Sequence, residues 1–145
     1  MSQPRVNCHV FVDFDGTIVP RDVTDYVLET FADPSWLDIE AEWKAGKIGS
    51  RDCLARQVAL IKATPQAMDD LIASIDIDPA FPDFVKFCEA EGLGISVLSD
   101  GLDRAVKGVL GRHGVDLPYA ANALASVGEM GWRLTFPHMK PSCVS

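Results

Sequence analysis

The sequence predicts an α/β fold: a parallel sheet with helices on its faces and a helical segment inserted after the first strand. Two apolar runs have the length and composition of buried strands, at residues 10–12 and 94–98. Residues 21–77, between them, show the three- and four-residue apolar spacing of helices. Two strands joined by helical crossovers pair in parallel more readily than as a hairpin.

Each element has its own signal in the chain. Apolar spacing predicts four helices in the inserted segment, at residues 23–31, 34–43, 50–61 and 68–75. Thr64 followed by Pro65 pairs a capping residue with a proline suited to a first helical position. Later elements are predicted as a helix at 79–91, a strand at 94–98, a helix ending at Gly114 and a hairpin at 120–136.

The run DFDGT, residues 13–17, directly follows the first predicted strand. Asp13 and Asp15 are two residues apart and therefore leave the strand end on the same side. Gly16 lets the backbone turn sharply and approach a ligand closely. One carboxylate of such a pair can act as a nucleophile while the other moves protons, and the pair can hold a cation.

A second polar group follows the strand at residues 94–98. There Ser99, Asp100 and Gly101 precede a predicted helix. A hydroxyl beside the free N–H groups of a helix start is suited to binding a phosphate, and it can equally serve as a plain helix cap. Because a carboxylate is unfavourable beside a phosphate, we expect Asp100 to cap the helix or to face the solvent.

These two motifs resemble those of the haloacid dehalogenase (HAD) superfamily of phosphohydrolases. Asp13, Asp15 and Thr17 match its first motif and Ser99 matches its second. The resemblance implies a Rossmann-like core with an inserted helical cap. We expect the core to comprise residues 1–20 and 78–145, incomplete at its C-terminus, and the cap to comprise residues 21–77.

The resemblance also implies a mechanism. Asp13 would attack phosphorus and form an aspartyl-phosphate, and Asp15 would be the general acid and base. Mg²⁺ would be held by Asp13 and by the main-chain carbonyl of Asp15, and Ser99 with the Asp100 and Gly101 amides would bind the phosphate. The implied activity is Mg²⁺-dependent hydrolysis of a small phosphomonoester.

Substrate contacts are expected from the cap. Asp22 occupies about the place of an acidic substrate residue in the phosphoserine phosphatase branch, but Gln57 stands where that branch has an arginine. With Arg56 at the neighbouring position, the chain looks more like the 2-hydroxy-3-keto-5-methylthiopentenyl-1-phosphate phosphatases of methionine salvage. We favour this branch over the phosphoserine phosphatases. Arg56 has a plain alternative as a solvated helix residue.

Composition limits the possible partners. The formal charge of −8 and pI near 4.7 argue against binding to nucleic acid or an anionic membrane surface. No apolar run is long enough for a membrane helix, and the N-terminus lacks the apolar core of a signal peptide. The four cysteines have no metal-type spacing, so we expect a reduced, cytoplasmic protein.

Two features that the resemblance implies are missing or displaced. No acidic residue follows Glu129 to supply the expected late metal motif, and Lys140 could stand in for the expected lysine or be a loop residue. We therefore expect a longer natural protein, and weak Mg²⁺ binding and little turnover from the 145-residue chain alone. A non-catalytic phosphate-binding remnant and a phosphotransferase or mutase of the same superfamily remain as alternatives.

Overall fold

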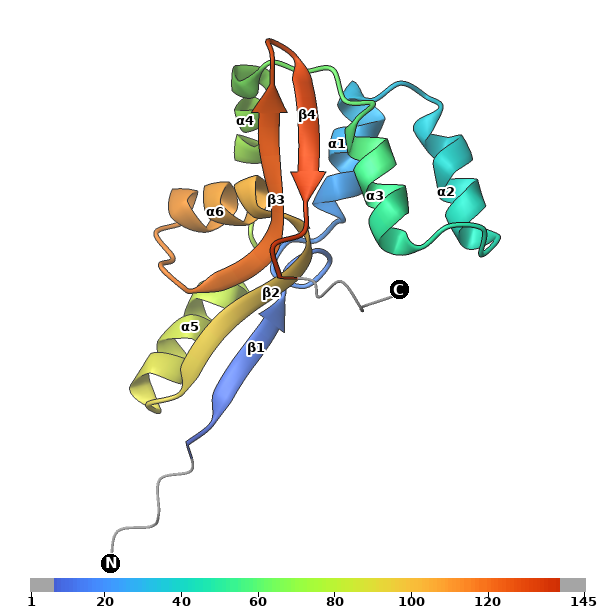
Figure 1. Ribbon diagram of the computed structural model, residues 1–145. Helices are drawn as coiled ribbons and strands as arrows, with labels where there is room; N and C mark the ends of the chain where they lie inside the picture. The colour runs from blue at the N-terminus through green and yellow to red at the C-terminus, as the bar shows by residue number, and fades with distance from the viewer. Residues whose placement is uncertain (1–6, 139–145) are drawn as a thin grey trace, which may run out of the picture.

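The computed structural model describes residues 7–138, which form four strands and six helices (Figure 1). The strands are β1 (His9–Asp13), β2 (Gly94–Leu102), β3 (Tyr119–Val127) and β4 (Gly131–Thr135). The helices are α1 (Val23–Phe31), α2 (Trp36–Lys44), α3 (Ser50–Val58), α4 (Pro65–Ala73), α5 (Ala80–Ala90) and α6 (Asp103–Arg112). Every predicted helix and strand is therefore present, although several ends move by a few residues. None of the described helices has the length and apolar character needed to cross a membrane.

The strands form one sheet in the order β1-β2-β3-β4. β1 pairs in parallel with β2, and β2 pairs in parallel with β3. β3 and β4 form an antiparallel hairpin, as predicted, and Gly128 in its turn adopts a φ of 64° that favours glycine. The predicted α/β class with a parallel sheet and a C-terminal hairpin is confirmed.

β2 differs from its prediction in a way that affects the site. It continues through Ser99, Asp100 and Gly101 to Leu102, instead of ending at Leu98. Leu98 pairs with Ala120 and Leu102 with Asn122, so four residues of β2 advance against two of β3 and form a bulge. Ser99 and Asp100 do not cap the following helix, because α6 begins only at Asp103. Of the two roles expected for Asp100, the structure shows the other one, exposure to solvent.

The core lies between the sheet and the helices that pack on it. α5 packs against β2, and α6 packs against β2 and β3 (Figure 1). Val97 of β2 and the valines Val106 and Val109 of α6 are fully buried. The apolar stripes of these helices recur at the spacing of one helical face, so their burial against the sheet accounts for the arrangement.

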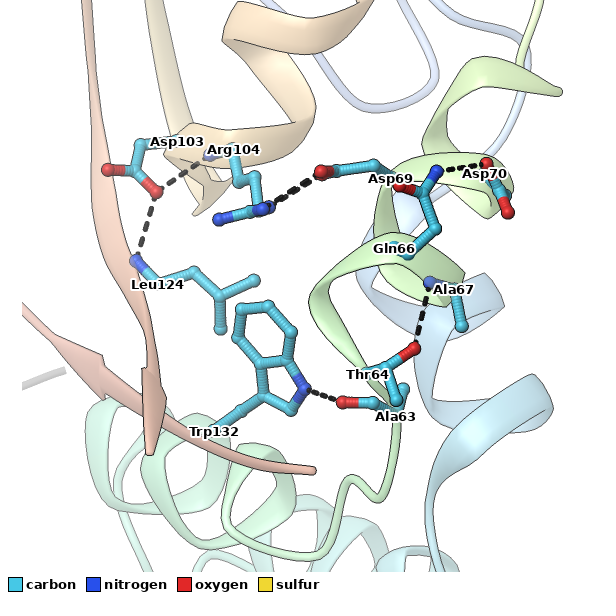
Figure 2. A network of polar contacts seen from close by, with 10 residues as sticks. All are labelled: Ala63, Thr64, Gln66, Ala67, Asp69, Asp70, Asp103, Arg104, Leu124 and Trp132. Atoms are coloured by element: carbon cyan, nitrogen blue, oxygen red, sulfur yellow. Dashed lines mark hydrogen bonds and ion pairs between the residues drawn. The ribbon is translucent and has the colours of Figure 1, made fainter. Parts of the chain in front are cut away.

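The inserted helices are joined to the rest of the fold at α4 and at the hairpin. Figure 2 shows Arg104 of α6 donating two hydrogen bonds to the carboxylate of Asp69 in α4, at 2.7 and 2.9 Å. It also shows Trp132 of β4 donating from Nε1 to the Ala63 carbonyl at 2.8 Å. Since α4 packs on α6, it is tied to the sheet side of the molecule. The division into core and cap with a boundary after residue 77 stays a prediction.

Candidate functional site

The DFDGT segment forms a tight loop at the carboxyl end of β1. Phe14 is buried, and its carbonyl accepts hydrogen bonds from the N–H groups of Thr17, Ile18 and Val19. Gly16 adopts a φ of 72°, so the turn predicted from that glycine is confirmed. Burial of Phe14 leaves Asp13, which is exposed, and the half-buried Asp15 on the outer side of the loop.

Each carboxylate of this loop is oriented by a backbone donor. The N–H of Phe14 donates to Asp13 Oδ1, and the N–H of Val23 donates to Asp15 Oδ1, both at 2.8 Å. Val23 is the first residue of α1, so Asp15 lies at a helix N-terminus, where negative charge is stabilised. The loop and the start of α1 thus hold Asp15 in one place.

Asp15 combines burial with nearby negative charge. Burial is the largest influence and raises the pKa of its carboxyl to about 6, against the lowering effect of the Val23 hydrogen bond. The charges of Asp22, Asp13 and Asp25 raise it further. A carboxyl with this pKa is partly protonated near neutral pH, which suits a group that both donates and accepts protons.

The bulge of β2 brings its polar residues to Asp15. A Cβ placed on Gly101 would lie 2.7 Å from Asp15 Oδ2, and 3.3 Å from both Ser99 Oγ and Thr24 Oγ1. Ser99 Oγ accepts the N–H of Gly101 at 3.0 Å. Asp100 faces the solvent, which is one of its two expected roles. Its main-chain carbonyl accepts a hydrogen bond from the side-chain amide of Asn122. Only a glycine fits at position 101 without displacing these groups.

A cleft of about 960 Å³ opens beside this cluster. Its floor is formed by the ends of β1 and β2, and residues of α1, α2 and α3 form another wall. Of the residues predicted from sequence for the site, six line it: Asp13, Asp15, Asp22, Ser99, Asp100 and Gly101. Asp22 also caps α1, since its Oδ1 accepts the N–H of Asp25 at 2.9 Å.

Arg56 is not among the described residues that line the cleft. Its guanidinium contacts Glu42 at 3.0 Å and Asp52 at 3.8 Å, and the side chain is exposed, which fits the plain alternative of a solvated helix residue. Arg51, on the same helix, does line the cleft. Arg51 and Arg56 are five residues apart, and in an α-helix that spacing separates two side chains by about 140° around the helix axis. The two arginines therefore point in different directions.

Several polar cleft residues were missed from sequence. Thr24 is buried beside Gly101, and Glu40 accepts a hydrogen bond of 2.8 Å from the buried amide of Gln57. Asp25 lines the cleft too, and burial, with Asp22 and Glu40 nearby, raises its pKa. These residues carry no spacing motif, and only their position at one cleft distinguishes them from ordinary helix residues.

The DFDGT loop offers two groups that could hold a cation, the Asp13 carboxylate and the main-chain carbonyl of Asp15. No group of three or more His, Cys, Asp or Glu side chains arranged for a metal occurs within residues 7–138. Magnesium is commonly held by one or two carboxylates together with water and substrate phosphate, so the exposed Asp13 carboxylate with the main-chain carbonyl of Asp15 suits such a site. Lys140 lies outside the described residues.

Taken together, the parallel sheet, the paired aspartates at the end of β1 and the polar bulge of β2 define an α/β protein with a polar cleft at the carboxyl ends of its parallel strands. The model of the family described as haloacid dehalogenase-like hydrolase matches residues 10–141. The chain belongs to this family.

Similar proteins agree with this assignment. A 2-hydroxy-3-keto-5-methylthiopentenyl-1-phosphate phosphatase of Brevibacillus brevis is 27% identical over 123 residues, which is 83% of this chain and 55% of that protein. Among solved structures, a HAD family hydrolase of Salmonella enterica serovar Typhi matches with a TM-score of 0.73 and 19% identity, over 93% of this chain and 46% of that one. A phosphoserine phosphatase with a phospho-aspartyl intermediate analogue matches with a TM-score of 0.68 and 21% identity, over 88% and 63%. The chain thus spans about half the length of the relatives it matches.

Proposed function

We propose that this chain forms the nucleophile-bearing part of a phosphatase that hydrolyses a small phosphomonoester through an aspartyl-phosphate. The observation that carries the proposal is the convergence of Asp13 and Asp15 with the Ser99–Gly101 bulge at one cleft. Family membership supports the same class of reaction.

In the first step, a carboxylate oxygen of Asp13 attacks phosphorus and the bond from phosphorus to the ester oxygen breaks. The Asp15 carboxyl donates its proton to the departing oxygen. In the second step, the Asp15 carboxylate takes a proton from water as that water attacks phosphorus. Inorganic phosphate leaves and Asp13 is regenerated as a free carboxylate. The pKa of about 6 at Asp15 supports both roles.

The remaining groups would position the phosphate and reduce charge repulsion. Ser99 and the amides of Asp100 and Gly101 would contact the phosphoryl oxygens, and the exposed Asp100 carboxylate would stay away from them. Mg²⁺ held at Asp13 and Asp15 would, when bound, offset the negative charge of both the carboxylates and the phosphate.

The similarity to a methionine-salvage enzyme supports a 2-hydroxy-3-keto-5-methylthiopentenyl-1-phosphate-like substrate. Phosphoserine phosphatase-like activity is the second candidate, favoured by the acidic residues Asp22, Asp25 and Glu40 at the cleft, which suit an amino group. Of the two predicted cap contacts, Asp22 lines the cleft, which supports this candidate.

The test is Mg²⁺-dependent release of phosphate from phenyl phosphate by the natural gene product and by the 145-residue chain. Asp13→Asn should lower the rate by at least about a thousandfold, because the nucleophile is lost. Asp116→Asn, an exposed loop residue, is the matched control and should keep full activity. Metal-independent activity, or activity that survives Asp13→Asn, would contradict the mechanism. No activity in either polypeptide would favour the non-catalytic phosphate-binding alternative.

A further inference from the structure

The cleft is strongly acidic, and its charge is unevenly distributed. Six carboxylates line it: Asp13, Asp15, Asp22, Asp25, Glu40 and Asp100. Among the described residues, Arg51 is the one lysine or arginine that lines it. A phosphate ester adds further negative charge, so the position of that single guanidinium matters for any anionic or oxygen-rich substrate.

Arg51 is the second residue of α3, and its half-buried side chain extends toward Phe136, just after β4. Its guanidinium carbon lies 5.2 Å from the centre of the Phe136 ring, within the range of a cation–π contact. The ion pairs found within residues 7–138 do not include Arg51, in contrast to Arg56 on the same helix. The Phe136 ring therefore supports the guanidinium while its planar set of donors is not committed to a carboxylate.

The cleft that Arg51 lines also has apolar surface, and Phe136 supplies part of it directly against the guanidinium. Trp43, Leu54 and Phe136 line this cleft, together with Cys53. Burial raises the pKa of the Cys53 thiol, so that side chain stays uncharged. This surface is suited to a short organic group with apolar surface and an oxygen that can accept hydrogen bonds from Arg51.

Asp13 and the β2 bulge belong to the strand ends, whereas Arg51 belongs to the helical wall. We propose that Arg51 determines specificity by binding an acceptor oxygen on the organic part of the substrate, while the phosphoryl group lies at Asp13. This inference rests on the proposed phosphatase function and names the feature that its substrate must carry. The acceptor is a ketone oxygen or a carboxylate, since a guanidinium donates to both.

The test measures binding of three probes by isothermal titration calorimetry in the presence of Mg²⁺, in the natural gene product carrying Asp13→Asn so that no probe is turned over. Dihydroxyacetone phosphate carries a ketone, phosphoglycolate carries a carboxylate, and phenyl phosphate carries neither. Arg51→Met removes the guanidinium and keeps a long side chain. Arg56→Met is the matched control, because it removes an arginine of the same helix that lies outside the cleft.

We expect Arg51→Met to weaken binding of at least one oxygen-bearing probe by roughly ten- to a hundredfold, the range for a lost charged hydrogen bond. Phenyl phosphate should change by less than about twofold, as should all probes with Arg56→Met, since exposed ion pairs contribute little. The probe that is affected identifies the acceptor as a ketone or a carboxylate. Arg51→Lys should give an intermediate loss, because it keeps the charge without the planar donors.

The failures of the two proposals can be told apart. If Arg51→Met weakens binding of all three probes equally, Arg51 contacts the phosphate and not the organic group. If Arg51→Met binds every probe as well as Arg56→Met does, Arg51 has no role in substrate binding. Either result overturns the inference and leaves the phosphatase proposal standing. If no probe binds to the natural gene product, even without the Arg51 substitution, the proposed function fails and the inference fails with it.

Discussion

The two walls of the cleft are built in different ways. At the strand ends, backbone geometry places Asp13, Asp15 and Gly101, through a parallel register, a glycine turn and a bulge. On the helical wall, side-chain packing decides which residue reaches the cleft, and it selects Arg51 over Arg56. The positions at the end of β1 could be anticipated from local sequence, whereas the bulge of β2 and the helical positions depended on how the elements pack together.

The sharpest test of the strand-end wall is Asp15→Asn. We expect activity to fall by about a hundred- to ten-thousandfold, because proton transfer to and from the reacting oxygens is lost. Steady-state phosphate release across pH 5–8 measures this. A variant that kept its activity over this range would exclude Asp15 as the acid and base.

The same substitution should stabilise the fold at neutral pH. Folded Asp15 holds its proton up to about pH 6, whereas its ordinary pKa is 3.8. The folded protein therefore binds more protons between these values, and this group lowers the free energy of unfolding as pH rises through that window. Urea unfolding should show Asp15→Asn more stable than wild type above pH 6, with little difference near pH 4. A difference that did not vary with pH would contradict this account.

Gly101→Ala tests the close approach of β2 to Asp15. The added methyl would lie 2.7 Å from Asp15 Oδ2, so we expect destabilisation of about 1–3 kcal/mol and reduced activity. Gly111→Ala is the matched control, since a Cβ in that part of α6 meets nothing within 4 Å. It should stabilise the protein by about 0.5–1 kcal/mol, as expected for replacing a helical glycine. Equal effects at the two sites, measured by urea unfolding, would show that the contact at Gly101 is unimportant.

Trp132→Phe tests the attachment of the helical side to the sheet. It removes the hydrogen bond from Nε1 to the Ala63 carbonyl shown in Figure 2, and we expect a loss of about 1–3 kcal/mol in unfolding free energy. Trp43→Phe, at a tryptophan that is 41% exposed, should cost less than about 0.5 kcal/mol. If both substitutions cost the same, the hydrogen bond does not anchor the hairpin.

The strand-end wall could be predicted because its signals are local. An apolar strand followed by DFDGT specifies both the direction of the two carboxylates and the turn at Gly16. The length of β2 could not be predicted in the same way. A serine, an aspartate and a glycine are typical of a helix start, and only the pairing of Leu102 with Asn122 draws them into the strand.

The sequence by itself determined the α/β class, the order of the elements and the pair of aspartates, because each depends on short-range periodicity and turn chemistry. The tertiary structure decided which helical residues meet them. Thr24 and Arg51 lie at the cleft because α1 and α3 pack in particular orientations, and those orientations depend on contacts such as Ala63 with Trp132, far apart in the chain. Contacts of that kind leave no local pattern, so only the folded structure assigns these residues to the site.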